Sequence, residues 1–260
     1  MCLLVIACQA HPRYRLVVAA NRDEYHERPT APLGWWASAD GPAILGGRDL
    51  RAGGTWLALD AARRVGIVTN YRDLQRSPPE APSRGTLIPD YLAQPATAAA
   101  FLAALAPSAQ RYSGFNLLLT DSDALWYGAN RATPFARALP PGVYGLSNHL
   151  LDTPWPKLAR VRRGFEAWLQ AVPTPPAAQL LELLADRTPA TSAEAAQSAS
   201  GLSPEWQRVL SAPFVVHPLY GTRSSTLVLL EASGAGLVQE RRFDASGQSS
   251  GETVERLAPR

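Results

Sequence analysis

Cys2 has the clearest chemical potential in this sequence, because it directly follows Met1. If Met1 is removed, the mature chain begins with a thiol nucleophile and a free α-amine. An α-amine, with a reference pKa of about 7.7–8.0, accepts a thiol proton without help from a histidine. A charged cluster, Asn21-Arg22-Asp23-Glu24, follows the second apolar run of the chain. A hairpin would return this cluster to the chain's start, so the pattern predicts a site built around Cys2.

A cysteine nucleophile needs three kinds of supporting group, and the sequence offers all three. A carboxylate must orient the amine, and Asp23 can do so. A positive charge favours the thiolate, and Arg22 or Arg223 supplies one. Hydrogen-bond donors must hold the oxyanion that forms on an attacked carbonyl. Asn70 and Asn148, each just past a predicted strand, are the candidate donors.

The same residues have structural interpretations that the sequence leaves open. Cys2 fits a small apolar position on a strand, and Arg22 with Asp23 fits a structural ion pair. In an extended segment, Asn21 and Asp23 would share one face and Arg22 would lie on the other. The two asparagines Asn70 and Asn148 fit caps of turns equally well.

Metal and nucleic-acid sites are not indicated. The histidines His26, His149 and His217 have no ligand spacing with Asp or Glu, which favours surface or packing positions over a metal site. The net charge of +3 is mild and the arginines are scattered, which argues against a nucleic-acid surface.

Strands near both ends of the chain and helices in its middle predict an α+β fold with antiparallel sheets. Residues 3–8 form a continuous apolar run, which is typical of a strand buried on both faces, and residues 16–20 should pair with it. Residues 155–172 have apolar side chains at helical spacing and predict the longest helix. We expect the first strand to be central in its sheet, and the last, at residues 253–257, to be an edge strand.

Other segments are expected to be irregular or short. After Tyr25 the prolines predict turns. The glycine pairs Gly46-Gly47 and Gly53-Gly54 predict tight turns or a close approach of the backbone, and turns are the simpler interpretation. Residues 214–216 predict a short strand, and residues 188–203 a loop or loose helix. No linker divides the 260 residues, so we predict a single domain.

Cysteine usage and hydropathy favour a soluble cytoplasmic protein. Cys2 and Cys8 are the only cysteines, and six residues along one strand separate their Cα atoms by roughly 20 Å, too far for a disulfide. The apolar run after Met1 is too short for a secretory signal, and no window approaches the ~18 apolar residues of a membrane span.

Several motifs together resemble the NRDE family, of the transport-and-Golgi-organisation type. Beyond the Met-Cys start and Asn21-Arg22-Asp23-Glu24, they are Gly46-Gly47-Arg48-Asp49, Gly53-Gly54-Thr55-Trp56, Gly66-Ile67-Val68-Thr69-Asn70-Tyr71-Arg72, Tyr144-Gly145-Leu146-Ser147-Asn148, Pro154-Trp155-Pro156-Lys157 and Tyr220-Gly221-Thr222-Arg223-Ser224-Ser225-Thr226. This family resembles the N-terminal nucleophile hydrolases, most closely the branch that includes bile-salt hydrolase and penicillin V acylase. The resemblance implies a four-layer αββα sandwich.

The resemblance also implies roles for individual residues. Cys2 matches the nucleophile of that branch and Asp23 its aspartate. Asn70 and Asn148 match its two asparagines, and Arg223 its late arginine. One position departs from the pattern, because its first arginine falls on Ala20 here, while Arg22 stands two residues later.

Two classes of function follow. The first is a cysteine amidohydrolase that acts on a non-peptide amide or acyl bond of a small or lipid-like molecule and requires no cofactor. The second is a binding or carrier protein for haem or an acyl lipid on an inherited hydrolase fold, since the resemblance points to haem and lipid homeostasis. Because a c-type haem attachment motif is absent, haem would be held non-covalently. The sequence does not predict an oligomeric state.

Overall fold

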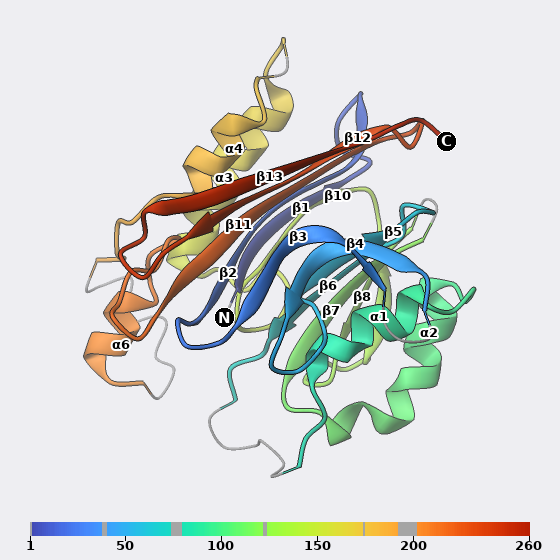
Figure 1. Cartoon of the computed structure of the whole chain (residues 1–260), viewed down its shortest axis with the longest axis horizontal. Helices are drawn as coiled ribbons and strands as arrows, with labels where there is room; N and C mark the ends of the chain where they lie inside the picture. The colour runs from blue at the N-terminus through green and yellow to red at the C-terminus, as the bar shows by residue number, and fades with distance from the viewer. Residues whose placement is uncertain (1, 38–40, 74–79, 122–123, 174, 192–201) are drawn as a thin grey trace. The chain divides into compact units, whose positions relative to one another are not determined.

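The computed structural model describes residues 2–37, 41–73, 80–121, 124–173, 175–191 and 202–260 (Figure 1). The chain groups into two compact units, each with its own antiparallel sheet. Unit 1 comprises Met1–Glu27, Pro141–Ser147 and Leu151–Arg260, and unit 2 comprises Arg28–Pro140 and Asn148–Leu150. The predicted α+β class is confirmed, whereas the prediction of a single domain stays a prediction.

The sheet of unit 1 has the strand order β10-β1-β2-β11-β12-β13. Its strands are β10 (Gly142–Leu146), β1 (Cys2–Cys8), β2 (Tyr14–Tyr25), β11 (Tyr220–Glu231), β12 (Gly236–Phe243) and β13 (Ser249–Leu257). β1 lies between β10 and β2 and is antiparallel to both, and residues 3–8 are buried throughout. The predictions of an interior first strand and of a last strand at the sheet edge are therefore confirmed.

Helices cover one face of this sheet. α3 (Pro156–Gln170) packs on β1 and β10, and α4 (Ala178–Leu184) packs on β2 and β11 (Figure 1). Pro156 suits the first position of α3, where no intrahelical N–H is needed. The buried side chains of α3 meet the odd-numbered residues of β1 and β2, among them Leu3 and Val5. A third helix, α6 (Pro204–Val209), belongs to the same unit.

The sheet of unit 2 is a meander in which each strand pairs with the next along the chain. Its strands are β3 (Thr30–Ala37), β4 (Ala43–Asp49), β5 (Leu57–Asp60), β6 (Val65–Asn70), β7 (Phe115–Thr120), β8 (Leu125–Ala129) and β9 (Ala136–Leu139). α1 (Leu87–Leu92) packs on β5 and β6, and α2 (Ala98–Leu105) packs on β8 and β9. The described residues of this unit also form the 3₁₀ turns η1 (Arg84–Thr86) and η2 (Ala106–Arg111).

Three expectations about the irregular segments were wrong. The stretch after Tyr25 contains strand β3, which tolerates Pro32 because it is the edge strand of its sheet and its register shifts between Ala31 and Gly34. Gly46 and Gly47 lie inside β4 rather than in a turn. Gly46 instead meets the alternative expectation of a close approach, because an added Cβ would lie 2.6 Å from the carbonyl oxygen of Leu57. Residues 214–216 are not a strand. The apolar side chain of Phe214 instead packs against Phe243, with ring centroids 4.7 Å apart.

The second glycine pair is explained by a turn and a close approach. Gly53 has a φ of +75°, which favours glycine. A Cβ added to Gly54 would lie 2.3 Å from the carbonyl carbon of Gly85, so only glycine fits there. The expected loop or loose helix at residues 188–203 falls largely on residues 192–201, which lie outside the described part of the chain.

Candidate active site

Cys2 stands opposite Arg22 at the start of β1. The backbone register pairs Cys2 with Arg22 of β2, and Arg22 in turn with Ser224 of β11. Directly opposed residues of an antiparallel sheet share one face, so these three positions form a row across unit 1. The side chain of Cys2 lies outside the described part of the structure. The backbone of Cys2 is thus held in the sheet by its pairing with β2.

Arg22, not residue 20, is at the level of Cys2. Ala20 pairs with Leu4, further into the sheet, and is 8% exposed. The Arg22 side chain is 5% exposed, and its Nη2 lies 3.9 Å from Oε2 of Glu24 on the same strand face. The register therefore assigns Arg22 to the face of Cys2, although the resemblance aligns the first arginine with Ala20.

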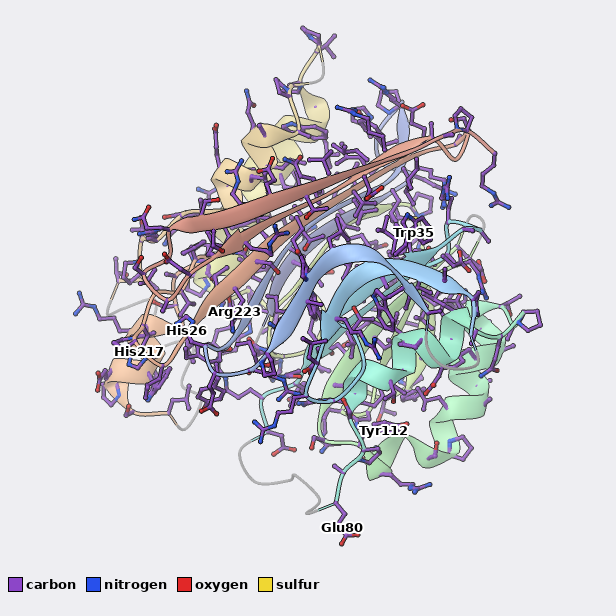
Figure 2. All side chains as sticks on the ribbon, viewed as in Figure 1. His26, Trp35, Glu80, Tyr112, His217 and Arg223 are labelled. Carbon is purple, nitrogen blue, oxygen red and sulfur yellow. The ribbon has the colours of Figure 1, made fainter. Side chains whose placement is uncertain are left out.

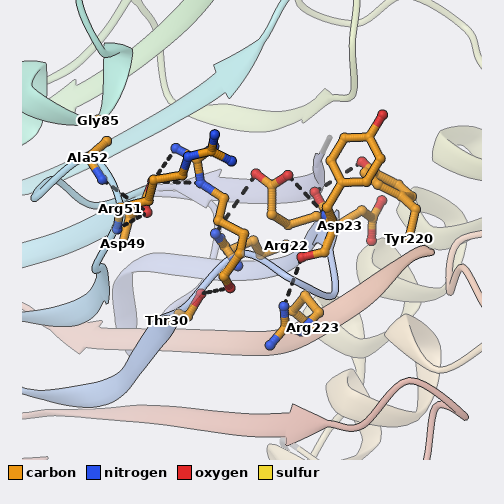
Figure 3. A network of polar contacts seen from close by, with 12 residues as sticks. Arg22, Asp23, Thr30, Asp49, Arg51, Ala52, Gly85, Tyr220 and Arg223 are labelled. Carbon is orange, nitrogen blue, oxygen red and sulfur yellow. Dashed lines mark hydrogen bonds and ion pairs between the residues drawn. The ribbon is translucent and has the colours of Figure 1, made fainter.

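Asp23 lies on the opposite face of β2, where the helices pack. β2 runs unbroken through Asn21, Arg22 and Asp23, which confirms that the first and third share a face. Asp23 is 1% exposed, its Oδ1 accepts a 2.7 Å hydrogen bond from Oγ1 of Thr222, and its backbone carbonyl accepts one from the Tyr220 hydroxyl (Figure 3). Burial raises the pKa of the Asp23 carboxyl above its ordinary value, although the charges of Lys157 and Arg22 oppose this shift.

Lys157 belongs to this charged cluster and was missed by our reasoning from residue chemistry. It is the only lysine of the chain, it is 3% exposed, and its charge is the largest favourable electrostatic influence on Asp23. A signal was present, because Lys157 precedes Val161 and Phe165 at four-residue steps along the buried stripe of α3. A lysine at a position where the period predicts an apolar side chain marks a buried charge.

Ser224 is the third member of the row and was also missed. Its side chain is 4% exposed, and within the described residues its Oγ has no hydrogen-bond partner. A buried hydroxyl without a partner is costly, so it marks a place where a ligand group would be stabilised.

Arg223 lies in a β-bulge. The register of β11 with β2 shifts between Thr222 and Ser224, which leaves Arg223 without an opposing residue. Its Nη1 donates to the carbonyl oxygens of Tyr25 and His26 at 2.9 and 3.1 Å (Figures 2 and 3). The structure thus gives Arg223 a role in holding the end of β2, and its predicted part in the chemistry stays a prediction.

Asn21 has a structural role in unit 1. Its Nδ2 donates to the carbonyls of Leu184 and Pro213 at 2.8 and 3.0 Å, and its Oδ1 accepts a 2.6 Å bond from the hydroxyl of Ser225. We expect Asn21→Leu to lower the free energy of unfolding by about 2–5 kcal/mol, because it leaves two buried carbonyls and one hydroxyl without their partner. Urea unfolding measures this loss.

The matched control for that variant is Ser225→Ala, which removes one bond of the three and should cost only about 1 kcal/mol. An Asn21→Leu protein as stable as the wild type would show that these bonds contribute nothing net.

Asn70 and Asn148 lie together in unit 2. Nδ2 of Asn148 donates to the backbone carbonyl of Asn70 at 3.0 Å, and the carbonyl of Asn148 accepts a 2.8 Å bond from the Arg72 N–H. Beside them, the Tyr71 hydroxyl and Nε2 of His149 are 3.1 Å apart, and burial lowers the pKa of that imidazole. The two asparagines are thus brought to each other, and their convergence on Cys2 stays a prediction.

His26 and His217, the other two histidines considered as metal ligands, make local contacts in unit 1. Nε2 of His26 lies 2.9 Å from the carbonyl of His217, and the ring of His217 packs on Trp206 with centroids 4.7 Å apart (Figure 2). Neither contact has the arrangement of a metal site.

In the described ranges, no helix combines the length and apolar character needed to cross a membrane.

Comparison with known proteins identifies the family. The family model "Transport and Golgi organisation 2" matches residues 1–245. The chain is 32% identical to the mouse Transport and Golgi organization 2 homolog and to the human homolog, over 97% of this chain and 97% of each relative. It is 27% identical to Drosophila melanogaster Transport and Golgi organization protein 2, over 89% of this chain and 88% of that protein.

Among solved structures, a C2A mutant of the conjugated bile acid hydrolase from Clostridium perfringens aligns with all of this chain and 97% of its own, with a TM-score of 0.44 and 8% identity. The match of the family model over nearly the whole sequence, together with relatives that align over nearly their whole length, shows that the chain belongs to the Transport and Golgi organisation 2 family.

Proposed function

We propose that the protein is an N-terminal cysteine hydrolase that cleaves a non-peptide amide or acyl bond of a small or lipid-like molecule. One observation carries the proposal: the backbone of Cys2 is fixed inside a sheet directly opposite the buried Arg22, with the buried carboxyl of Asp23 next along β2. Burying an arginine and an aspartate beside a chain terminus is costly, and a purely structural strand end does not require it.

The two faces of β2 suit the two groups of an N-terminal cysteine. Arg22 lies on the face to which the register assigns Cys2, where its charge favours a thiolate. Asp23 lies on the other face, and because a backbone nitrogen lies in the plane of the sheet, the α-amine is within reach of either face. In the proposed reaction the amine takes the thiol proton and Asp23 orients the amine.

The reaction then proceeds by acyl transfer. The Cys2 sulfur attacks the carbonyl carbon, and the oxyanion collapses as the carbon–nitrogen bond breaks. The leaving nitrogen takes the proton from the ammonium of Cys2. Water, deprotonated by the same amine, attacks the thioester and releases the acid and the thiol. Asn70 and Asn148 are the proposed oxyanion donors, and the buried hydroxyl of Ser224 is a further group that substrate would satisfy.

The test is a pair of preparations that differ only at the amine of Cys2. In both, a leader precedes Cys2 and Met1 is omitted, and a site-specific protease removes the leader from one of them. We expect the trimmed protein to hydrolyse members of a panel of acyl amides and thioesters, and the untrimmed protein to be at least about 100-fold slower, because an acylated nitrogen is not a base.

Equal rates in the two preparations would show that the amine is not the base. Absence of turnover in both would overturn the hydrolase proposal. The alternative proposal, a carrier for haem or an acyl lipid, then predicts that both preparations bind these ligands equally, as spectroscopic titration with haem and with a fluorescent fatty acid would show.

A further inference from the structure

Lys157 lies where a lysine is unfavourable for α3 itself. Its position in the first turn of the helix puts a positive charge near the positive end of the helix dipole, and this turn contains no acidic residue to offset that charge. Its side chain is 3% exposed, among neighbours in α3 that are buried and apolar, such as Leu158 and Val161. Burying an ammonium group is expensive unless a partner is present. A leucine or methionine would suit the helix better, so something outside the helix must offset the cost.

Asp23, also in unit 1, is the buried carboxyl on which the charge of Lys157 acts. It lies on the face of β2 that the helices cover, and it is 1% exposed. Thr222 fixes the orientation of the carboxyl, because its Oγ1 donates to Oδ1 of Asp23 and accepts a 2.9 Å bond from the N–H of Val215. The charge of Lys157 has a larger electrostatic influence on the Asp23 carboxyl than the charge of Arg22 has. Burial nevertheless raises the pKa of the Asp23 carboxyl, so removal of the lysine charge would raise it further.

Asp23 and Lys157 are both linked to the start of β1 through their neighbours in the chain. Asp23 follows Arg22, the register partner of Cys2, and α3 packs on β1 and β10. Leu158, the residue after Lys157, packs in the same cluster as Leu3, the residue after Cys2. The first turn of α3 and the start of β1 therefore contribute to one apolar cluster.

We propose that Lys157 is a positioning residue of the Cys2 site: from the first turn of α3 its ammonium keeps the buried Asp23 carboxylate charged and in place to hold the amine of Cys2. The inference rests on the proposed function, since it gives Asp23 its task. It adds a residue on a helix to a catalytic set drawn otherwise from strand ends and loops. Arg22 acts on the thiol from one face of the sheet, and Lys157 acts through Asp23 on the other.

The first part of the test asks whether the two side chains form a charge pair. Unfolding by guanidinium chloride is measured for wild type, Lys157→Met, Asp23→Asn and the double variant, each at pH 5 and pH 8. We expect each single variant to be strongly destabilised and the double variant to recover much of the loss, with a coupling on the order of 100-fold in the unfolding equilibrium constant. Lys157→Arg keeps the charge and is the conservative control.

The pH dependence has a definite sign. The pKa of Asp23 is raised in the folded protein, so in the pH range between this pKa and the ordinary one the folded protein keeps a proton that the unfolded chain has lost. The free energy of unfolding therefore falls as the pH rises through this range. Without the lysine charge this fall continues to higher pH. Lys157→Met should therefore lose more stability at pH 8 than at pH 5. The groups that act on the Asp23 carboxyl are Lys157 of α3, the N-terminal amine of the chain, Thr222 of β11 and Arg22 of β2, and Lys157→Met changes Lys157 alone.

The second part of the test measures the reactivity of the Cys2 thiol. In the trimmed protein, iodoacetamide labelling of Cys2 is followed by peptide mass spectrometry from pH 5 to pH 9. We expect Lys157→Met to move the midpoint of labelling up by about one pH unit, because a protonated Asp23 no longer holds the ammonium that favours the thiolate. Lys157→Arg should leave the midpoint near that of the wild type.

Three results would overturn the inference. The first is an equal loss of stability in Lys157→Met at pH 5 and pH 8. The second is the absence of coupling between Lys157→Met and Asp23→Asn in the double variant. Either result would mean that the two side chains do not form a charge pair. The third is coupling without a shift of the labelling midpoint, which would make the pair structural only. If Lys157→Met does not fold, Lys157→Arg and the double variant still report the pair and the midpoint. Neither readout needs a substrate, so failure of the hydrolase proposal, seen as absent turnover, is distinguishable from failure of this one.

Discussion

Cys2→Ala is expected to abolish hydrolysis, with a loss of at least about 10⁴-fold in kcat for any substrate that the wild type turns over. The reason is that the proposed reaction passes through a bond to the Cys2 sulfur, and no other group in the row formed by Cys2, Arg22 and Ser224 is a thiol. The change should leave the fold intact, because alanine is compatible with the end of a strand. Steady-state assays with the acyl-amide panel measure the loss, and circular dichroism monitors the fold.

Cys8→Ala is the matched control for this variant. Cys8 is the chain's other cysteine, lies at the far end of the same strand and is buried. Its loss should cost some stability and leave turnover within about twofold of the wild type. Turnover that survives Cys2→Ala would contradict the proposed nucleophile. Haem or acyl-lipid binding that survives it, with no turnover in the wild type, would favour the carrier.

Arg22→Gln is expected to slow iodoacetamide labelling of Cys2 by about tenfold at pH 6 and much less at pH 9. The Arg22 guanidinium is nearly fully buried on the face of Cys2, so its charge favours the thiolate more than a solvated charge would. Once the pH is high enough to ionise the thiol without this help, the difference disappears. Peptide mass spectrometry of Cys2 across this pH range measures the shift.

Arg22→Lys retains a positive charge and is the control, with an expected effect of less than about threefold. Glu24, the ion-pair partner of Arg22, is partly exposed, so the loss of this partner in Arg22→Gln is tolerable. An unchanged labelling profile in Arg22→Gln would show that Arg22 does not serve Cys2. The presence of Ala20 where the hydrolase branch has its first arginine would then mean that the arginine of this set is missing.

The sequence was sufficient to predict the features that depend on local pattern. The two-sided apolar run at residues 3–8 predicted an interior strand, and β1 is one. The period of two along a strand predicted opposite faces for Arg22 and Asp23, and β2 stays extended through both. These predictions succeeded because side-chain direction in a strand follows from sequence position alone.

Features that depend on pairing between distant segments were beyond a reading of the sequence. The register that sets Arg22 against Cys2 depends on the β1–β2 connection, in which Gln9 takes a φ of 50°. The bulge at Arg223 likewise depends on the pairing of β11 with β2, and the hydrogen bond from Asn148 to Asn70 joins two residues that are far apart in the sequence. The apolar period of α3 signalled the burial of Lys157, but its influence on Asp23 could not be predicted, because Asp23 belongs to another element.

The most direct test of the central claim, that Cys2 begins the mature chain and is the nucleophile, is the intact mass of the protein quenched in acid during turnover of an acyl amide. We expect a mass that lacks Met1 and a fraction of molecules heavier by the acyl group, with peptide mapping that places the acyl group on the Cys2 sulfur. The fraction should be absent from Cys2→Ala. Retained Met1 together with no acyl adduct and no turnover by the wild type would contradict the claim.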